Sequence, residues 1–251
     1  MSILRATVRR ESMTTNMRYM VMHKVDATME AGERPSQTII ENMGKLVGRS
    51  LKEGIFKDGA GLHRSAMRAR VTFPAGKPRV QRGPYAGDNE LVANLALVST
   101  TGIDQAIVLA TELGQAAGRR EIEIGPVVEG WDLTGKPRPA DAPHRFLLVT
   151  KGDAESESGK AQAPAVRALL DQWKHDGVLQ SEIALRPTKT AHRYKATGGK
   201  RAWIDGPFTE SKELLAGFSV IEVPTLDDVK RWTVEYASIL GDNEVDIREV
   251  A

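Results

Sequence analysis

Apolar residues recur along the chain in two alternating patterns: short continuous runs and longer stretches with helical spacing. Continuous apolar runs at residues 19–22 and 146–149 are typical of buried strands. In the stretches that follow them, apolar residues are three and four positions apart, which predicts an amphipathic helix after each run. These positions are Ile39, Ile40, Met43, Leu46 and Val47 in one stretch, and Val166, Leu169, Leu170 and Trp173 in the other.

The rest of the pattern is also doubled. In each half a hairpin, a strand, a helix and a final strand are expected after the first helix. These elements are expected at residues 67–73 with its return strand, 95–98, 103–113 and 121–124 in the first half, and at 191–196 with its return strand, 218–223, 226–240 and 244–247 in the second. Few strands with helices interspersed indicate an α+β fold, with the helices on one face of an antiparallel sheet.

The doubling extends to residue identities. Residues 17–32 align without a gap on 144–159, and residues 83–98 align on 206–221. Identical pairs are Arg18/Arg145, Lys24/Lys151, Asp26/Asp153, Ala27/Ala154, Glu30/Glu157 and Gly32/Gly159. We therefore predict an internal duplication. Because two copies are too few for a solenoid, we expect them to pack on each other as a pseudo-dimer.

This duplication predicts four segments. Residues 1–16 carry no apolar stretch of the kind found in secretion signals, and we expect a flexible N-terminal extension. Residues 17–134 form the expected first domain, the Pro-rich residues 135–143 a linker, and residues 144–251 the second domain. Two sheets packed face to face would bury their inner faces as a barrel-like core.

Composition narrows the classes of partner. The 251 residues include 35 Lys and Arg against 33 Asp and Glu, for a formal net charge of +2. So small a charge exerts no general pull on nucleic acids or anionic membranes. Cysteine is absent, which excludes disulfides, thiolate nucleophiles and Cys-based zinc sites. No apolar run approaches the roughly 20 residues of a membrane span. We expect a cytoplasmic protein without nucleic-acid or membrane partners, and leave further homodimerisation open.

The segment 205–213 holds the main candidate chemistry. Asp205 would act as a general base if burial raised its pKa, and Lys212 would bind an anionic ligand. In the alternative interpretation, Asp205 caps the Gly-Pro turn and Lys212 pairs with Glu210 and Glu213 on the surface.

His192 lies in the predicted hairpin whose return strand leads to Asp205. Pairing across the tight turn would bring the two side chains together as a proton-transfer unit. The alternative is an exposed histidine on a strand surface. No histidine and carboxylate spacing indicates a metal site, so neither a metal nor a cofactor is expected.

The repeated Lys24/Lys151 and Asp26/Asp153 pairs also allow two interpretations. They would form two related sites, one per half, or they would end each first strand at the sheet edge, where charge discourages aggregation. We favour the second.

The second half carries the sequence Asp205-Gly206-Pro207-Phe208-Thr209-Glu210-Ser211-Lys212-Glu213, together with the turn Gly198-Gly199-Lys200. On these residues it resembles the DGPF family, a branch of the YciI-related proteins, over essentially all of 144–251. The first half looks like a degenerate copy: it keeps Gly83-Pro84-Tyr85, but Arg82 replaces the aspartate.

The resemblance implies two ferredoxin-like domains of βαββαβ type that form a dimeric α+β barrel, here within one chain. DGPF proteins are often encoded beside extracytoplasmic-function sigma factors, and their activity is mostly undefined. YciI relatives are thought to use a His–Asp pair, with the histidine in a Pro-x-His context. This chain has Ala163-Pro164-Ala165-Val166 there and so departs from that pattern.

Two hypotheses follow. In the first, the protein is a small-molecule enzyme with a carboxylate-centred cleft in its C-terminal half. Asp205 and His192 are then catalytic, and the ligand contacts are Phe208, Glu210, Lys212 and Glu213. In the second, it is a non-catalytic ligand-binding or regulatory module, associated with an extracytoplasmic-function sigma factor. The sequence does not decide whether the protein is an enzyme.

Overall fold

The computed structural model describes residues 15–88, 91–152, 164–208, 211–212 and 214–251. It is an α+β structure with antiparallel strands. The strands are β1 (Met17–Lys24), β2 (Phe56–Leu62), β3 (Ala69–Thr72), β4 (Arg79–Arg82), β5 (Val92–Thr100), β6 (Ile122–Val128), β7 (His144–Lys151), β8 (Leu179–Ala184), β9 (His192–Thr197), β10 (Lys200–Asp205), β11 (Leu215–Val223) and β12 (Asn243–Glu249). The helices are α1 (Ala27–Ala31), α2 (Gln37–Lys52), α3 (Ile103–Ala116), α4 (Gly130–Thr134), α5 (Pro164–His175) and α6 (Leu226–Leu240). Residues 1–14 of the expected extension lie outside the described residues.

The strands are arranged in two rows that run β10-β9-β12-β1-β11-β2 and β4-β3-β6-β7-β5-β8. Each row mixes strands from both halves of the chain, because β1 lies between β12 and β11 while β7 lies between β6 and β5. β2 pairs with β6 to join the rows at one side. At the other side, Leu185 after β8 bridges Val250 after β12. The amide of Ala251 also donates to the carbonyl oxygen of Ala184 over 2.8 Å.

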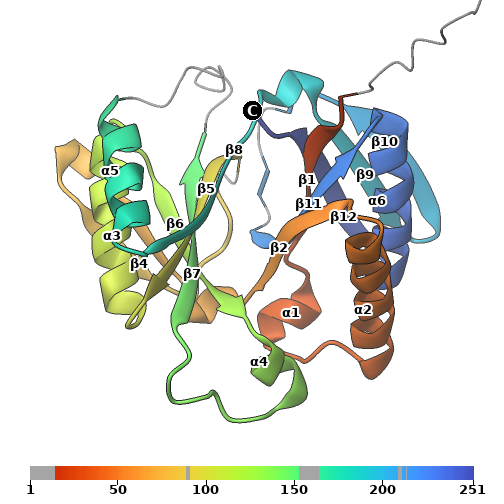
Figure 1. Ribbon diagram of the computed structural model, residues 1–251, viewed down its shortest axis with the longest axis horizontal. Helices are drawn as coiled ribbons and strands as arrows, with labels where there is room; N and C mark the ends of the chain where they lie inside the picture. Colours follow the sequence, from red (N-terminus) through yellow and green to blue (C-terminus); the bar gives the residue numbers. More distant parts are fainter. Residues whose placement is uncertain (1–14, 89–90, 153–163, 209–210, 213) are drawn as a thin grey trace, which may run out of the picture.

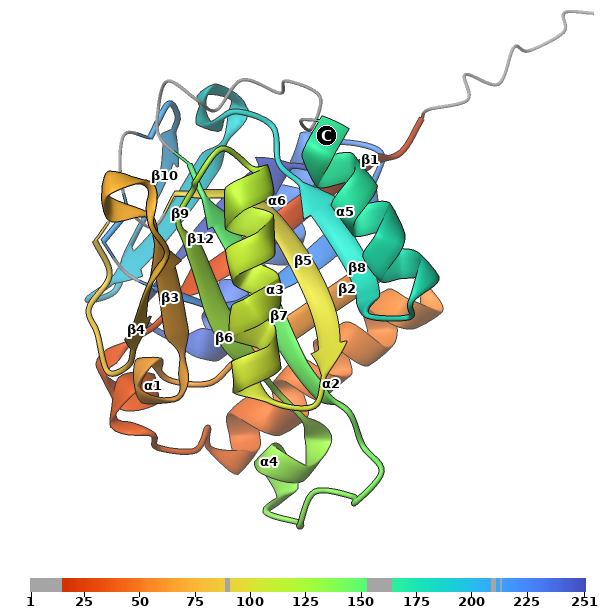
Figure 2. The ribbon, with the colours of Figure 1, turned by 90° about the vertical axis from the view of Figure 1, so that its left-hand side faces the viewer.

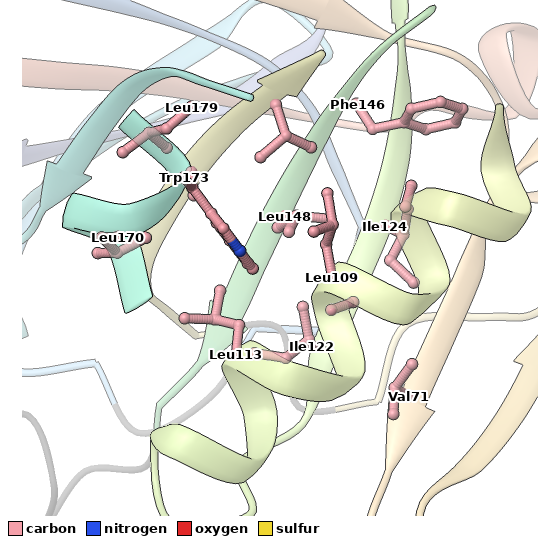
Figure 3. Close-up of a cluster of buried hydrophobic side chains, with 14 of the residues drawn as sticks. Val71, Leu109, Leu113, Ile122, Ile124, Phe146, Leu148, Leu170, Trp173 and Leu179 are labelled. Carbon is pink, nitrogen blue, oxygen red and sulfur yellow. The ribbon is translucent and has the colours of Figure 1, made fainter. Parts of the chain in front are cut away.

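Helices cover the outer face of each row (Figure 1). α3 and α5 pack side by side on the row that contains β5 to β8, as Figure 2 shows. Trp173 of α5 and Leu109 and Leu113 of α3 lie in one buried cluster with Ile124 and Leu148 of the strands beneath them (Figure 3). α2 and α6 cover the other row in the same way, with Leu46 and Trp232 in its cluster of buried side chains.

A third apolar cluster lies between the two rows. It includes Met20 and Met22 of β1 and Leu147 and Val149 of β7. On β7, Phe146 and Leu148 point instead to the helix layer, because successive side chains of a strand alternate between its faces. Both faces of β1 and β7 are thus buried, which explains their continuous apolar runs.

The sequence pattern missed β2. Its sequence FKDGAGL is polar and contains two glycines, so it carries no strand signal. The strand forms because it pairs antiparallel with β11, which lies more than 150 residues later in the chain and supplies the backbone hydrogen-bond partners. A Cβ at Gly59 would lie 2.9 Å from the carbonyl oxygen of Phe218, so the close approach of the two strands favours glycine there.

Among the described residues, no helix is long and apolar enough to span a membrane.

Candidate functional site

Charged side chains are buried at the ends of the central strands, on the strand faces that point into the space between the two rows. In the first group, Lys24 Nζ lies 3.1 Å from Asp246 Oδ2. Arg193 binds the same carboxylate with both ends of its guanidinium, at 2.6 Å from Nε and 3.0 Å from Nη2. The Arg193 guanidinium also lies 4.3 Å from the ring centre of Phe208. This arrangement fixes Phe208 against the charged group.

A second group also combines a lysine, a carboxylate and an aromatic ring, with two arginines in place of one. Lys151 Nζ lies 2.8 Å from Glu123 Oε2, and Arg68 Nη1 lies 2.7 Å from Glu123 Oε1. Arg70 stacks on the ring of Tyr85 at 4.4 Å. Glu123 is 1% exposed, so almost all of its charge is compensated by these neighbours rather than by water.

These positions overturn the interpretation of Lys24 and Lys151 as sheet-edge charges. Both lysines end central strands and are about as buried as the core, at 6% and 5% exposure. The edge interpretation was wrong because carboxylates from other strands, Asp246 and Glu123, accept the two ammonium groups. Asp26 has a different role: its carboxylate accepts the Met29 amide over 2.8 Å and caps α1. Asp153 lies outside the described residues.

Burial and neighbouring charges act together on the pKa of Lys151 and against each other on the pKa of Asp246. Burial lowers the pKa of Lys151 well below its ordinary value, and the charges of Arg70, Arg68 and Lys24 add to this effect. Burial alone would raise the pKa of Asp246. Lys24 and the Arg193 guanidinium outweigh burial, and that pKa lies below its usual value. The interior therefore holds Asp246 as a carboxylate.

Two Gly-Pro loops place the aromatic rings. A Cβ on Gly83 would lie 1.7 Å from the Ser65 carbonyl oxygen, and one on Gly206 would lie 1.8 Å from that of Thr188. Only glycine allows such an approach of two backbones. Thr188 Oγ1 then accepts the amide of Phe208 and donates to its carbonyl oxygen, each over 3.1 Å. Phe208 is buried against Leu91 and Ala191 as a result.

His192 and Asp205 are brought together as the hairpin predicts, since they are paired residues of β9 and β10. His192 Nδ1 lies 2.6 Å from Asp205 Oδ1. The Asp205 side chain is 75% exposed, and its hydrogen bond with His192 lowers its pKa. The hydrogen bond with His192 outweighs the desolvation that would raise the pKa of Asp205, because the carboxylate lies exposed on β10, the outermost strand of its row. The catalytic role of the pair stays a prediction.

A cleft of about 530 Å³ opens where the turn after β1 meets the first Gly-Pro loop and the segment before β11. It is lined by Val25, Asp26, Ala27, Glu30, Ser65, Pro84, Tyr85, Ala86, Gly87, Lys212 and Leu214. The Val25 amide donates to the Leu214 carbonyl oxygen over 2.8 Å, which joins the two halves of the chain at this point. The expected cleft was in the C-terminal half, but this one takes most of its lining from the N-terminal half, because the strands are interleaved.

Hydrogen bonds hold the walls of this cleft together. Glu30 accepts the Ser65 amide with Oε2 over 3.1 Å and the Ser65 hydroxyl with Oε1. Ser65 Oγ in turn accepts the Tyr85 amide over 3.3 Å. Tyr85 donates its own hydroxyl to the Ala69 carbonyl oxygen over 3.1 Å, and its burial raises its pKa. Helix α1 and the Gly-Pro loop are thus fixed relative to each other.

Of the predicted ligand contacts, Lys212 lines this cleft. Phe208 lies in the buried group with Arg193, and Asp205 and His192 lie at the outer hairpin, so these predicted residues do not share one site. Glu210 and Glu213 lie outside the described residues. Glu30 and Tyr85 also line the cleft but were not among the residues predicted from the sequence. The signals were present, since Glu30 is identical in both copies and Tyr85 occupies the aromatic position of the Gly-Pro loop.

A buried histidine, His23, is paired with a tyrosine outside the cleft. His23 Nδ1 and the Tyr236 hydroxyl are 2.6 Å apart beneath α6. Burial lowers the pKa of His23 to about 4, so this histidine is neutral at neutral pH and serves packing. In the described part of the chain, no three His, Asp or Glu side chains are grouped as metal ligands.

Comparison with protein families finds a match, which lies in the second half of the chain. Residues 144–249 match the YCII-related domain. No curated protein matches the chain.

Proposed function

We propose, on the premise that residues 144–249 carry a YCII-related domain, that the chain is a tandem YciI-like protein of the DGPF branch. Its degenerate first copy would be residues 17–134 and its second copy residues 144–251. The two rows of strands support this proposal, because each strand of one row corresponds to its counterpart in the other, 120 to 130 residues away along the chain. The two Lys-carboxylate-Arg groups and the two Gly-Pro-aromatic loops support it as well.

In this proposal the chain forms an intrachain dimeric α+β barrel with two ferredoxin-like sheets. The sheets are β12-β1-β11-β2 and β6-β7-β5-β8, each with two helices on its outer face. The β2–β6 pairing and the bridge from Leu185 to Val250 support closure. Each sheet takes two strands from either copy. Neither copy could then form a complete four-stranded sheet from its own strands alone.

The function that the geometry supports best is binding of a small organic molecule in the cleft. The observation that carries it is a cleft of about 530 Å³ lined by Tyr85 and Leu214 together with carboxylates and Lys212. Its size lies within the range of about 300–1,000 Å³ of small-molecule sites, and its mixture of apolar walls with few charged groups is typical of them.

Binding without catalysis is favoured over an enzyme. Both carboxylate oxygens of Glu30 already accept hydrogen bonds from Ser65, so this carboxylate positions the wall instead of accepting a substrate proton. Asp205 is exposed and its lowered pKa makes it a weak base. The enzyme hypothesis rests on the 2.6 Å contact of His192 with Asp205. A regulatory link to a sigma factor rests on the family resemblance alone.

A fragment screen by protein-observed NMR tests the binding function. Ala86 lines the cleft and is exposed, so Ala86→Trp should fill it without disturbing the core. We expect small molecules that bind the wild-type chain to lose at least about tenfold in affinity to this variant, a change of about 1.4 kcal/mol.

The matched control is Ala140→Trp, in the exposed connection between α4 and β7, which should leave binding unchanged. Fragments that bind both variants as well as the wild type would place the ligand elsewhere and end the cleft proposal.

A further inference from the structure

The cleft carries charges of both signs, and they come from different halves of the chain. Asp26 and Glu30 belong to the turn after β1 and to α1, whereas Lys212 belongs to the segment before β11. The backbone contact from Val25 to Leu214 keeps these two segments adjacent. A ligand that enters this cleft therefore meets carboxylates and an ammonium group within the same space.

The hydrogen bonds of the two cleft carboxylates show which of them can take a further donor. Glu30 accepts two hydrogen bonds from Ser65, one on each oxygen, and so has fewer acceptor positions left than Asp26. Asp26 uses Oδ1 to cap α1, and in the described part of the chain its Oδ2 takes no hydrogen bond. A carboxylate offers about four acceptor positions, so Asp26 can receive an ammonium group and still cap the helix. The ammonium group of Lys212 has three N–H donors and can direct one of them to a carboxylate of the ligand.

The rest of the cleft is apolar. Val25, Pro84 and Leu214 line it, and the Tyr85 ring is held by its hydroxyl bond to Ala69 and by Arg70. These surfaces suit a hydrocarbon or aromatic side chain of modest size.

We infer that the cleft takes an amphoteric small molecule of the amino-acid type. Its ammonium group binds Asp26, its carboxylate binds Lys212 and its apolar side chain packs on Tyr85. This inference rests on the proposed binding function and names the ligand class for the same cleft.

Matched probes test this assignment on the full chain by calorimetric titration. L-norleucine is compared with hexanoate, which lacks the ammonium group, and with pentylamine, which lacks the carboxylate. L-phenylalanine is compared in the same way with phenylpropanoate and phenylethylamine. We expect each amino acid to bind at least about tenfold more tightly than either of its analogues, because each loses one charge-assisted contact.

Two variants assign the contacts. Asp26→Asn keeps an N-cap residue for α1 and should bring the amino acids down to the affinity of the acids. Lys212→Met should bring them down to the affinity of the amines. The matched controls Asp104→Asn and Lys189→Met, at exposed positions that do not line the cleft, should change neither preference.

Equal affinity for an amino acid and one of its analogues would overturn the inference, as would an unchanged preference in the Asp26→Asn variant. If no probe binds while fragments still bind in a manner that Ala86→Trp abolishes, the ligand class is wrong and the binding function stands. If no fragment binds in the cleft, both proposals fail.

Discussion

Replacing Glu123 with alanine is expected to lower the free energy of unfolding by about 3 to 5 kcal/mol. The Glu123 carboxylate is 1% exposed and accepts from Lys151 at 2.8 Å and from Arg68 at 2.7 Å. Without it, the Lys151 and Arg68 side chains stay in the interior and lose the counter-charge that Glu123 supplies. An uncompensated buried charge is among the most destabilising changes in a folded protein.

Urea unfolding followed by circular dichroism measures this change. The matched control is Glu235→Ala, which removes the exposed ion pair between Glu235 and Arg49 at 2.6 Å. With both side chains about half exposed, that loss should stay below about 1 kcal/mol. Equal effects of the two substitutions would show that the interior group contributes no more than a surface pair.

Substituting Gly206 with alanine is expected to cost about 4 kcal/mol or more, or to prevent folding. The added Cβ would lie 1.8 Å from the Thr188 carbonyl oxygen. Because this oxygen belongs to the backbone, a change of side-chain rotamer cannot relieve the clash. Relief requires the Gly-Pro loop to move away from Thr188, and with it Phe208, which Thr188 holds through two hydrogen bonds. The loop and the buried group beside Arg193 would be disturbed together.

Gly44→Ala is the control with the opposite sign. Gly44 lies within α2, where an added Cβ meets no atom within 4 Å. Alanine is favoured over glycine in a helix interior, so this variant should be more stable by about 0.5–1 kcal/mol. Thermal unfolding of both variants should therefore move in opposite directions. A Gly206→Ala protein with wild-type stability would contradict the close approach of the two backbones.

Periodicity predicted most elements of the fold because it is a local property. The runs at 19–22 and 146–149 became β1 and β7, and the helical spacings became α2 and α5. Partner choice is not local. β1 pairs with β11 and β12, about 200 residues later, and nothing in the spacing of its own side chains indicates which strands flank it. The polar, glycine-containing β2 depends on such a partner altogether.

The same distinction between local and long-range information applies to the residues of the candidate site. The contact of His192 with Asp205 could be predicted because a tight hairpin fixes its own register. The exposure of Asp205 could not, since it depends on whether another element covers β10. The repeated Lys24 and Lys151 were visible in the sequence. Their burial depends on Asp246 and Glu123, which lie on strands that sequence spacing does not place beside them.

The interleaving of the two halves is the claim on which both the buried groups and the cleft depend. Treatment of the monomeric chain with a zero-length carbodiimide, followed by peptide mapping, tests it directly. This reagent joins a lysine amine to a carboxylate in contact with it. Lys57 on β2 and Glu222 on β11 are 3.2 Å apart and partly exposed, whereas Lys195 and Glu244 form a pair within the C-terminal half at 3.9 Å.

We predict both the Lys57–Glu222 and the Lys195–Glu244 cross-links in the monomer fraction. A Lys195–Glu244 cross-link without the Lys57–Glu222 cross-link would mean that β2 does not pair with β11, and would contradict the interleaved arrangement.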